Sequence, residues 1–396
     1  MTTTNSYIFN PISYLLTLII LGCFIYLLCT LSDKILQYIY NPIIRIISNK
    51  YIFRTSIQIL IDGRSSTPQL SGISRYIIEL TKGYAKQYGE KNLTIIVNNP
   101  ISYLPFKQTI CPYKRHGFRD NIKFSIWLSK QNYEIYHSGD MIGPFWHKKG
   151  VKHIITCHDL MHLVVPGFFR VTPIKAALRK LRIKYFFKYV AKDADTIISV
   201  SKTTHDDLKR IYNIDSIILP EGVNRIKNKD ISKEYKGLKN NSFFLYVGLG
   251  SAHKNIDFMV NAFLSTNIEK KLVICGKGHH IIKSNRIIYT GYIEDKELDY
   301  LYQNCSAFIF PSKYEGFGLP ILEALSYHCK VFSSNAGSLG EFSSEIIHFF
   351  NPYEEKELVT LINNCDNIKI DNNAIDKYLE KFNWETIWHK FHNTIQ

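Results

Sequence analysis

Two glutamates lie eight residues apart near the end of the chain, in the stretch Glu315-Gly-Phe-Gly-Leu-Pro-Ile-Leu-Glu323. The first follows a strand-like segment, 307–310, and the second falls in an expected helix that begins at Pro320. A carboxylate only accepts hydrogen bonds, whereas the free N–H groups of a helix start attract anions. The stretch therefore predicts a corner that binds a phosphate and several hydroxyls.

Other candidate residues follow strand-like segments earlier in the chain. Segment 153–156 leads to His158 and Asp159, segment 56–61 leads to Gly72 and a helix near 73–88, and segment 243–247 leads to Lys254. Ligands of open parallel sheets bind beyond the carboxyl ends of strands, where these residues lie. Two plain alternatives stay open, because a lone histidine is more often structural and a glycine can simply relieve backbone strain.

No metal or cofactor is expected. His153, His158 and His162 straddle a strand end, so their spacing does not place three ligands on one face. The eight cysteines include no CxxC pair and are expected to be buried free thiols in a reducing compartment.

The formal charge of +15 is spread along the 396 residues and indicates an anionic partner. The sequence has no zinc-finger, RNA-recognition or helix-turn-helix signature, so we do not expect binding to nucleic acid. A phosphorylated small substrate and an anionic membrane surface are favoured instead.

The first residues predict a membrane anchor. Segment 12–31 is almost wholly apolar, which is the length of a membrane-spanning helix, and no basic start or cleavage site of a signal peptide is present. Basic residues follow the span but do not precede it, which predicts that the rest of the chain is cytoplasmic. Segment 35–53 is apolar and broken by Pro42; we expect it at the inner leaflet, with a buried hydrophobic hairpin as the alternative.

Segment 174–192 predicts a basic amphipathic helix. It has no acidic residue, and its basic residues are Lys175, Arg179, Lys180, Arg182, Lys184, Lys188 and Lys192. Such a helix suits an anionic membrane surface. An ordinary solvated face above a buried apolar stripe is an equally good interpretation.

Alternating strand and helix patterns predict an α/β fold with two doubly wound, Rossmann-like domains that face a cleft. The expected boundaries are 1–54 for the transmembrane and juxtamembrane segments, 55–227 for the first domain, 228–241 for a polar linker, 242–372 for the second domain and 373–396 for a terminal helix that packs back on the fold. Region 101–130 is irregular, and we predict no element there.

The chain resembles retaining glycosyltransferases of family 4, which have the GT-B fold. The specific match is the paired-glutamate motif Glu315 to Glu323, preceded by Phe310-Pro-Ser312. Weaker support comes from Ser71-Gly-Ile-Ser-Arg-Tyr76, His158-Asp159, Ser199-Val-Ser201, Tyr246-Val-Gly248 with Lys254-Asn255, Gly276-Lys-Gly278 and the loop Gly337 to Glu341. The resemblance covers residues 56–396 in the family's order.

The resemblance implies roles for these residues. Glu315 would contact the donor-sugar hydroxyls, Glu323 the ribose, and Lys254 the diphosphate. The implied catalytic residues are Glu315, His158 and Lys254, and His158 and Asp159 would lie on the acceptor side, in the first domain. The implied donor-binding residues are Gly72, His253, Lys254, Glu315, Gly316, Phe317, Gly318, Leu319 and Glu323. The family retains anomeric configuration and needs no divalent metal.

One departure from the family pattern concerns the diphosphate. Many members have an arginine after the glycine that corresponds to Gly248, where this chain has Leu249, and close relatives often have an arginine at the position of His253. Diphosphate binding is therefore expected to depend more on Lys254, with His253 as a substitute cation.

The expected function is transfer of a hexosyl unit from a nucleotide-diphosphate sugar to a lipid-linked saccharide acceptor. The expected place is the cytoplasmic face of the inner membrane, with a single-pass anchor, as in bacterial surface polysaccharide synthesis (O-antigen or capsule). The alternatives are a nucleotide-sugar epimerase or hydrolase of related fold, and a catalytically silent membrane scaffold.

Overall fold

The computed structural model describes residues 57–67, 71–115, 117–169, 171–223, 235 and 237–395, and residues 56–396 form one compact unit. The predicted membrane segment 12–31, the following segment 35–53 and most of the predicted linker 228–241 lie outside the described residues. Within the described ranges, no helix combines the length and the apolar composition that a membrane crossing needs.

The N-terminal half, residues 57–223, contains a sheet of seven parallel strands in the order β3-β2-β1-β4-β5-β6-β7. The strands are β1 (Ile59–Asp62), β2 (Leu93–Val97), β3 (Gln108–Ile110), β4 (Ile135–Ser138), β5 (Lys152–Cys157), β6 (Thr196–Ser199) and β7 (Ile217–Ile218). The strands β1 and β4 are buried along their whole length. Burial along a whole strand is typical of parallel strands that helices cover on both faces.

The C-terminal half, residues 237–395, contains six parallel strands in the order β10-β9-β8-β11-β12-β13. These are β8 (Phe243–Val247), β9 (Lys271–Cys275), β10 (Ile287–Gly291), β11 (Ala307–Phe310), β12 (Val331–Ser334) and β13 (Ile347–Phe350). Both sheets are parallel and their orders reverse at the first strand of each half, so the predicted pair of doubly wound α/β sheets is confirmed.

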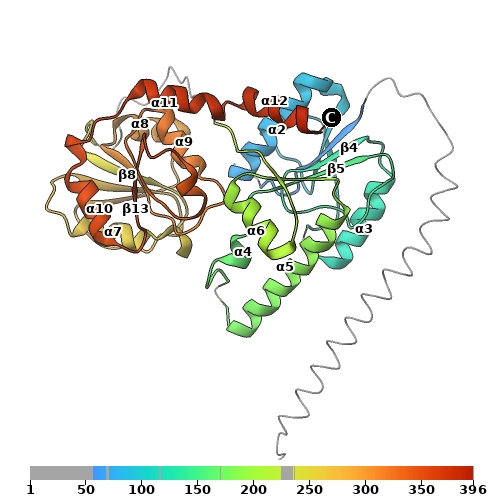
Figure 1. Ribbon diagram of the computed structural model, residues 1–396, viewed down its shortest axis with the longest axis horizontal. Coiled ribbons are helices and arrows are strands. Elements are labelled where there is room, and N and C mark those ends of the chain that lie inside the picture. Colours follow the sequence, from blue (N-terminus) through green and yellow to red (C-terminus); the bar gives the residue numbers. More distant parts are fainter. Residues whose placement is uncertain are drawn as a thin grey trace, which may run out of the picture. The chain divides into compact units, whose positions relative to one another are not determined.

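Helices cover both faces of each sheet (Figure 1). In the N-terminal half they are α2 (Gly72–Tyr88), α3 (Phe118–Ser129), α4 (Met161–Val164), α5 (Pro173–Asp193) and α6 (Lys202–Tyr212). In the C-terminal half they are α7 (Ile256–Leu264), α8 (Asp295–Asn304), α9 (Leu319–Ser326), α10 (Glu355–Asn363) and α11 (Asn372–Leu379). The last helix, α12 (Trp384–Ile395), packs on the N-terminal half instead.

The region that the sequence left without an element, 101–130, contains β3 and α3. β3 has three residues at the sheet edge and is not buried, so it lacks the apolar run by which strands are recognised. In α3 the buried positions include Asn121 and Ser125 as well as Phe124 and Leu128, which weakens its apolar periodicity.

The end of the chain forms two helices where the sequence predicted one. A 3₁₀ turn, Glu380–Phe382, separates α11 from α12, and the Asn383 side chain accepts a hydrogen bond from the Glu385 N–H at 2.8 Å. This cap starts a new helix, α12. Helix α12 packs on α2 of the N-terminal half, where the ring centres of Tyr84 and Trp388 lie 4.9 Å apart.

Candidate active site

The loop between β11 and α9 carries Glu315 to Gly318 and lies against the N-terminal half. A Cβ atom added to Gly316 would lie 2.0 Å from the His158 carbonyl oxygen. Gly318 has a φ of +119° directly before α9, a conformation that L side chains rarely adopt. Both positions therefore need glycine, for close approach in one case and for backbone conformation in the other.

Two further contacts join the loop region to α6. The Glu341 carboxylate accepts hydrogen bonds from the backbone N–H groups of Lys202 and Thr203 at 2.9 and 2.6 Å, so it caps the first turn of α6. The Tyr314 hydroxyl donates to the Asp207 carboxylate at 2.7 Å. The two halves thus meet through specific polar contacts beside the glycine loop.

Lys254 and Glu315, both predicted as site residues, form an ion pair. The distance from Lys254 Nζ to Glu315 Oε1 is 2.7 Å, and the side chains are only 16% and 10% exposed. Lys254 Nζ also lies 5.3 Å from the centre of the Phe310 ring. The pair places a fixed cation and a hydroxyl-binding carboxylate next to each other in a mostly dry setting, where charge interactions are strong.

Two glycine turns lie at the carboxyl ends of β8 and β9. A Cβ on Gly250 would lie 2.0 Å from the Gly278 carbonyl oxygen, and a Cβ on Gly276 would lie 1.9 Å from that of Gly248. Backbone packs directly on backbone here, so side chains are excluded. Leu249, between two of these glycines, is 62% exposed and brings no charge to the edge.

A cavity with a volume of about 430 Å³ lies beside these turns. It is lined by Gly250 to His253 from the C-terminal half and by Phe168, Phe169 and Arg179, among others, from the N-terminal half. Burial lowers the pKa of His253, so its ring is uncharged at neutral pH and is a weak replacement for an arginine. Arg179 contributes a permanent positive charge to the same cavity.

Glu323 lies on α9 and contacts both halves. Arg75 Nη1 of α2 is 3.4 Å from Glu323 Oε1, and the Tyr302 hydroxyl donates to Glu323 Oε2 at 3.2 Å. Burial raises the pKa of Glu323, and the Arg75 charge opposes that rise. Gly72 begins α2 close by, where an added Cβ would be 4.0 Å from Leu319 Cδ1. The structure therefore brings Gly72, Leu319 and Glu323 together.

His158, which follows β5, donates from both ring nitrogens. Nδ1 lies 2.6 Å from Glu221 Oε1 and Nε2 lies 2.9 Å from the Gly139 carbonyl oxygen. Although burial opposes the charged form, the bond to Glu221 raises the pKa of His158 to about 9. The ring is an imidazolium with both N–H groups engaged, which suits it to electrostatic and positioning roles rather than to proton abstraction.

Asp159 and His158 lie at a second cavity, with a volume of about 510 Å³. Its other walls come mainly from α4, α5 and the segment between them and carry Met141, Met161, Phe168, Phe169, Arg179, Arg182, Phe186 and Phe187. Burial raises the pKa of Asp159 to about 6. Apolar rings, two guanidiniums and the carboxylates of Asp140 and Asp159 make this a pocket for an amphipathic molecule that carries polar or charged groups.

Four site residues were missed by the sequence analysis: Arg75, Arg179, Glu221 and Tyr302. Glu221 could have been found from the sequence, because it follows the carboxyl end of β7. His158 was selected by the same rule, that ligands bind beyond the carboxyl ends of parallel strands. The other three lie inside helices, and only the packing of the two halves shows which way they face.

Comparisons with known proteins agree with this fold. Residues 70–225 match the family model "Glycosyltransferase Family 4", and residues 227–381 match the model "Glycosyl transferases group 1".

Among curated proteins, the chain is 24% identical over 245 residues to the O-antigen chain mannosyltransferase RfbU of Salmonella typhimurium, covering 59% of this chain and 66% of that protein. It is 28% identical over 235 residues to the O-antigen chain mannosyltransferase B of Escherichia coli, covering 52% and 58%. The matches therefore span less than two thirds of the length of these relatives.

Solved structures show the same fold at low identity. The lipopolysaccharide outer core galactosyltransferase WaaB aligns with a TM-score of 0.61 and 17% identity, covering 86% of this chain and 99% of that chain. Anabaena Alr3699/HepE in complex with UDP-glucose aligns with a TM-score of 0.65 and 15% identity, with the same coverage. The fold is therefore GT-B-like.

Proposed function

Since both halves of the chain are glycosyltransferase domains, we propose that it moves a hexosyl unit from a nucleotide-diphosphate sugar to a lipid-linked saccharide, with retention of configuration. The observation that carries this proposal is the Lys254–Glu315 pair, 2.7 Å apart between the glycine turns and the start of α9. The names of the curated relatives favour bacterial O-antigen synthesis as the setting.

In this proposal the C-terminal half holds the donor. Glu315 accepts hydrogen bonds from sugar hydroxyls and Glu323 from the ribose, as carboxylates do. Lys254 and the N–H groups at the α9 start hold the diphosphate, with Gly72 at the start of α2 on the opposite side. Gly316 to Leu319 complete the wall, and His253 adds an uncharged ring. The residues supply binding and electrostatics without a metal.

The reaction breaks the bond between the anomeric carbon and the diphosphate oxygen, and the electron pair leaves on the diphosphate. The acceptor hydroxyl oxygen bonds to the same face of that carbon, and its proton passes to the departing phosphate. Lys254 stabilises the negative charge that grows on the diphosphate. The His158 imidazolium, held by Glu221, adds positive charge near the sugar, and Asp159 faces the acceptor.

Arg179 takes over the charge that Leu249 lacks. Its side chain lines the cavity beside Gly250 and His253, although it comes from α5 in the other half. A guanidinium binds phosphate oxygens in a bidentate manner, which the neutral His253 ring does not do. The proposal thus places one diphosphate-binding cation on each half, Lys254 and Arg179.

The lipid-linked acceptor occupies the 510 Å³ cavity beside His158 and Asp159. Methionine and phenylalanine side chains there suit an acyl or prenyl chain, and Arg179 and Arg182 suit the phosphates that join the chain to the sugar.

Helix α5, which forms one wall of this cavity, is the surface that meets the membrane. Ile174, Leu178, Leu181 and Tyr185 are spaced along one stripe and are 75%, 63%, 51% and 53% exposed. The alternative of a buried stripe is therefore wrong for this part of α5, which buries only Phe187, Val190 and Ala191. An exposed apolar stripe among basic residues suits an anionic bilayer surface. We place this surface at the cytoplasmic face of the inner membrane, with 12–31 as the single-pass anchor.

The experiment that tests the reaction uses the full chain, a panel of nucleotide sugars that includes GDP-mannose and UDP-glucose, and a lipid-diphosphate-linked saccharide. One donor should raise the thermal midpoint and give transfer with retained configuration, and Glu315→Gln and Lys254→Ala should each lower turnover by about 100-fold or more while still folding. Near-normal turnover in both variants contradicts the assignment. Rapid product formation from the donor alone favours the epimerase or hydrolase, and no binding of any donor favours the scaffold.

The membrane surface is tested with vesicles of anionic and of neutral lipid, using residues 56–396 without the anchor. Leu178→Ser with Leu181→Ser should weaken binding to anionic vesicles several-fold, whereas Ser265→Ala, at the exposed residue that follows α7, should not. Equal binding of all three proteins would show that α5 does not face the bilayer.

A further inference from the structure

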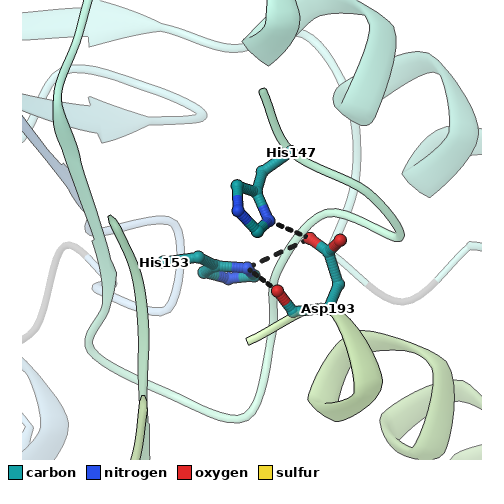
Figure 2. Close-up of side chains that lie close together, drawn as sticks. All are labelled: His147, His153 and Asp193. Carbon is teal, nitrogen blue, oxygen red and sulfur yellow. Dashed lines mark hydrogen bonds and ion pairs between the residues drawn. The ribbon is translucent and has the colours of Figure 1, made fainter. Parts of the chain in front are cut away.

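Three side chains from separate elements converge at the amino end of β5, away from the proposed active site (Figure 2). His147 lies in the loop before β5, His153 is the second residue of β5, and Asp193 is the last residue of α5. Each residue offers one candidate ligand atom: an imidazole nitrogen from each histidine and a carboxylate oxygen from Asp193. These three atoms lie within 4.8 Å of one another.

The geometry is that of three ligands aimed at one point. His147 Nδ1 is 2.8 Å from Asp193 Oδ2, and His153 Nδ1 is 3.1 Å from the same oxygen (Figure 2). With metal–nitrogen and metal–oxygen bonds of about 2.0–2.2 Å, ligand atoms of a tetrahedral zinc site lie about 3.3 Å apart. The two distances to the Asp193 oxygen are close to this spacing, and all three candidate ligand atoms lie within 4.8 Å of one another. To bind a metal ion, His153 Nδ1 would have to give up its contacts with the carboxylate and with the Asp193 backbone carbonyl oxygen, which lies 3.2 Å away.

We propose that His147, His153 and Asp193 bind a divalent transition-metal cation of the zinc type. Two imidazoles with one carboxylate suit Zn²⁺, and not the oxygen-preferring Mg²⁺ or Ca²⁺. His147 also has the outer partner that metal-bound histidines usually have, since its Nε2 lies 3.6 Å from Asp195 Oδ2. His153 is fully buried, whereas His147 and Asp193 are 16% and 17% exposed, so a cation can reach the site from solvent.

The site has a structural role. It lies at the start of β5, while His158 follows the end of that strand about 16 Å farther along, at 3.3 Å per residue. The reaction proposed above therefore proceeds without this metal. What the cation joins is the loop before β5, the strand itself and the carboxyl end of α5, and it thereby fixes the helix that carries the exposed apolar stripe. Because the unfolded chain lacks this arrangement, binding stabilises the fold.

The simpler interpretation is a hydrogen-bonded cluster, in which one carboxylate oxygen accepts from two Nδ1–H groups. The two interpretations differ in a measurable way, because a cluster held by protons has no specific affinity for a metal ion. Cobalt distinguishes them, since four-coordinate Co²⁺ absorbs strongly in the visible region and hydrated Co²⁺ does not.

The full chain, purified in detergent without a histidine tag and treated with a chelator, is titrated with Co²⁺ and, separately, with Zn²⁺. We expect one Co²⁺ per chain with the visible absorption of a four-coordinate site, displacement by Zn²⁺, and a higher thermal midpoint with Zn²⁺. His147→Gln and Asp193→Asn should lose the absorption, and circular dichroism checks that both fold.

His328→Asn is the matched control, because His328 also faces a carboxylate, Asp376, at 3.1 Å on the surface of the C-terminal half. It should bind Co²⁺ like the parent chain. The proposal is overturned if the parent chain shows no stoichiometric binding, or if the partly exposed His147→Gln variant binds Co²⁺ unchanged. If Asp193→Asn does not fold, the Co²⁺ titrations of the parent chain and of His147→Gln decide between the two interpretations.

Discussion

The two halves build their sides of the site by different means. The C-terminal half uses backbone: Gly250 and Gly276 pack against opposing carbonyl groups, Gly318 has a positive φ, and one ion pair, Lys254–Glu315, adds charge. The N-terminal half uses side chains from several elements, with His158 held by Glu221 and a cavity walled by rings and guanidiniums. Under the proposed function, backbone geometry suits a diphosphate that does not vary, whereas side chains can change with the acceptor.

The largest effect should come from breaking the backbone contact between the halves. In Gly316→Ala the added Cβ meets the His158 carbonyl oxygen, so the loop must move away and take Glu315 with it. Because displacement by about 1 Å costs about 100-fold, we expect turnover to fall by that much or more. Steady-state rates measure this, with Ser265→Ala as a folded control; a rate within threefold of the parent contradicts the close contact.

The next effect tests whether one half supplies a cation for the other. Arg179→Ala should raise the donor KM about 10- to 100-fold, the range for a lost hydrogen bond to a charged group. Leu249→Arg in the same chain should recover much of that loss, since it returns a guanidinium to the glycine turn. Lys175→Ala on the same helix serves as the control. If Leu249→Arg gives no recovery, Arg179 does not bind the donor diphosphate and keeps only its second proposed role, at the acceptor phosphates.

A smaller effect concerns pH. His158 has a pKa of about 9 in the folded chain against 6.5 in the unfolded chain, so the stability from the His158–Glu221 pair is fully present below about 6.5 and is lost as the pH rises through 9. Glu221→Gln should lower the pKa of His158 and flatten this pH dependence. Ring NMR shifts give the pKa, and denaturation at pH 6 and pH 9.5 gives the stability; identical curves for both proteins argue against the pair.

The smallest effect is expected at the Arg75–Glu323 contact. The distance is 3.4 Å and Arg75 is 43% exposed, so water and salt weaken the interaction. Arg75→Ala should change the donor KM by only about two- to fivefold, and less at high salt. A loss comparable with that of Arg179→Ala would instead assign Arg75 a direct role in holding the donor.

The sequence revealed the C-terminal side of the site more fully than the N-terminal side. The reason is that the C-terminal residues are neighbours in the chain, whereas the N-terminal contacts join residues that are far apart in it. Glu315, Gly316, Gly318 and Glu323 lie within nine consecutive residues, so their spacing is visible in the chain. The partner of His158, by contrast, is 63 residues away, and that of Glu323 is 248 residues away on α2. Such pairs depend on how the sheets pack.

Strands with strong apolar patterns were predicted closely: the segments expected at 243–247 and 307–310 are β8 and β11, with those bounds. α3 and β3 were missed because polar residues occupy some of their buried positions or because the strand is exposed. The sequence also showed the basic face of α5, but not that its apolar stripe remains uncovered, since solvent exposure depends on what the fold places beside a helix.

The return of α12 to the N-terminal half has a mechanical consequence. The chain passes between the halves twice, after Val223 and again near Phe382, and the Val223 N–H donates to the Phe382 carbonyl oxygen at 2.9 Å. Trp384 packs against Gly222 at the same place. Because the two crossings are held together at one point, we expect them to act as a single pivot that favours swinging of the halves over sliding. Cutting the chain before α12 would loosen that pivot and leave Tyr84 without its covering rings.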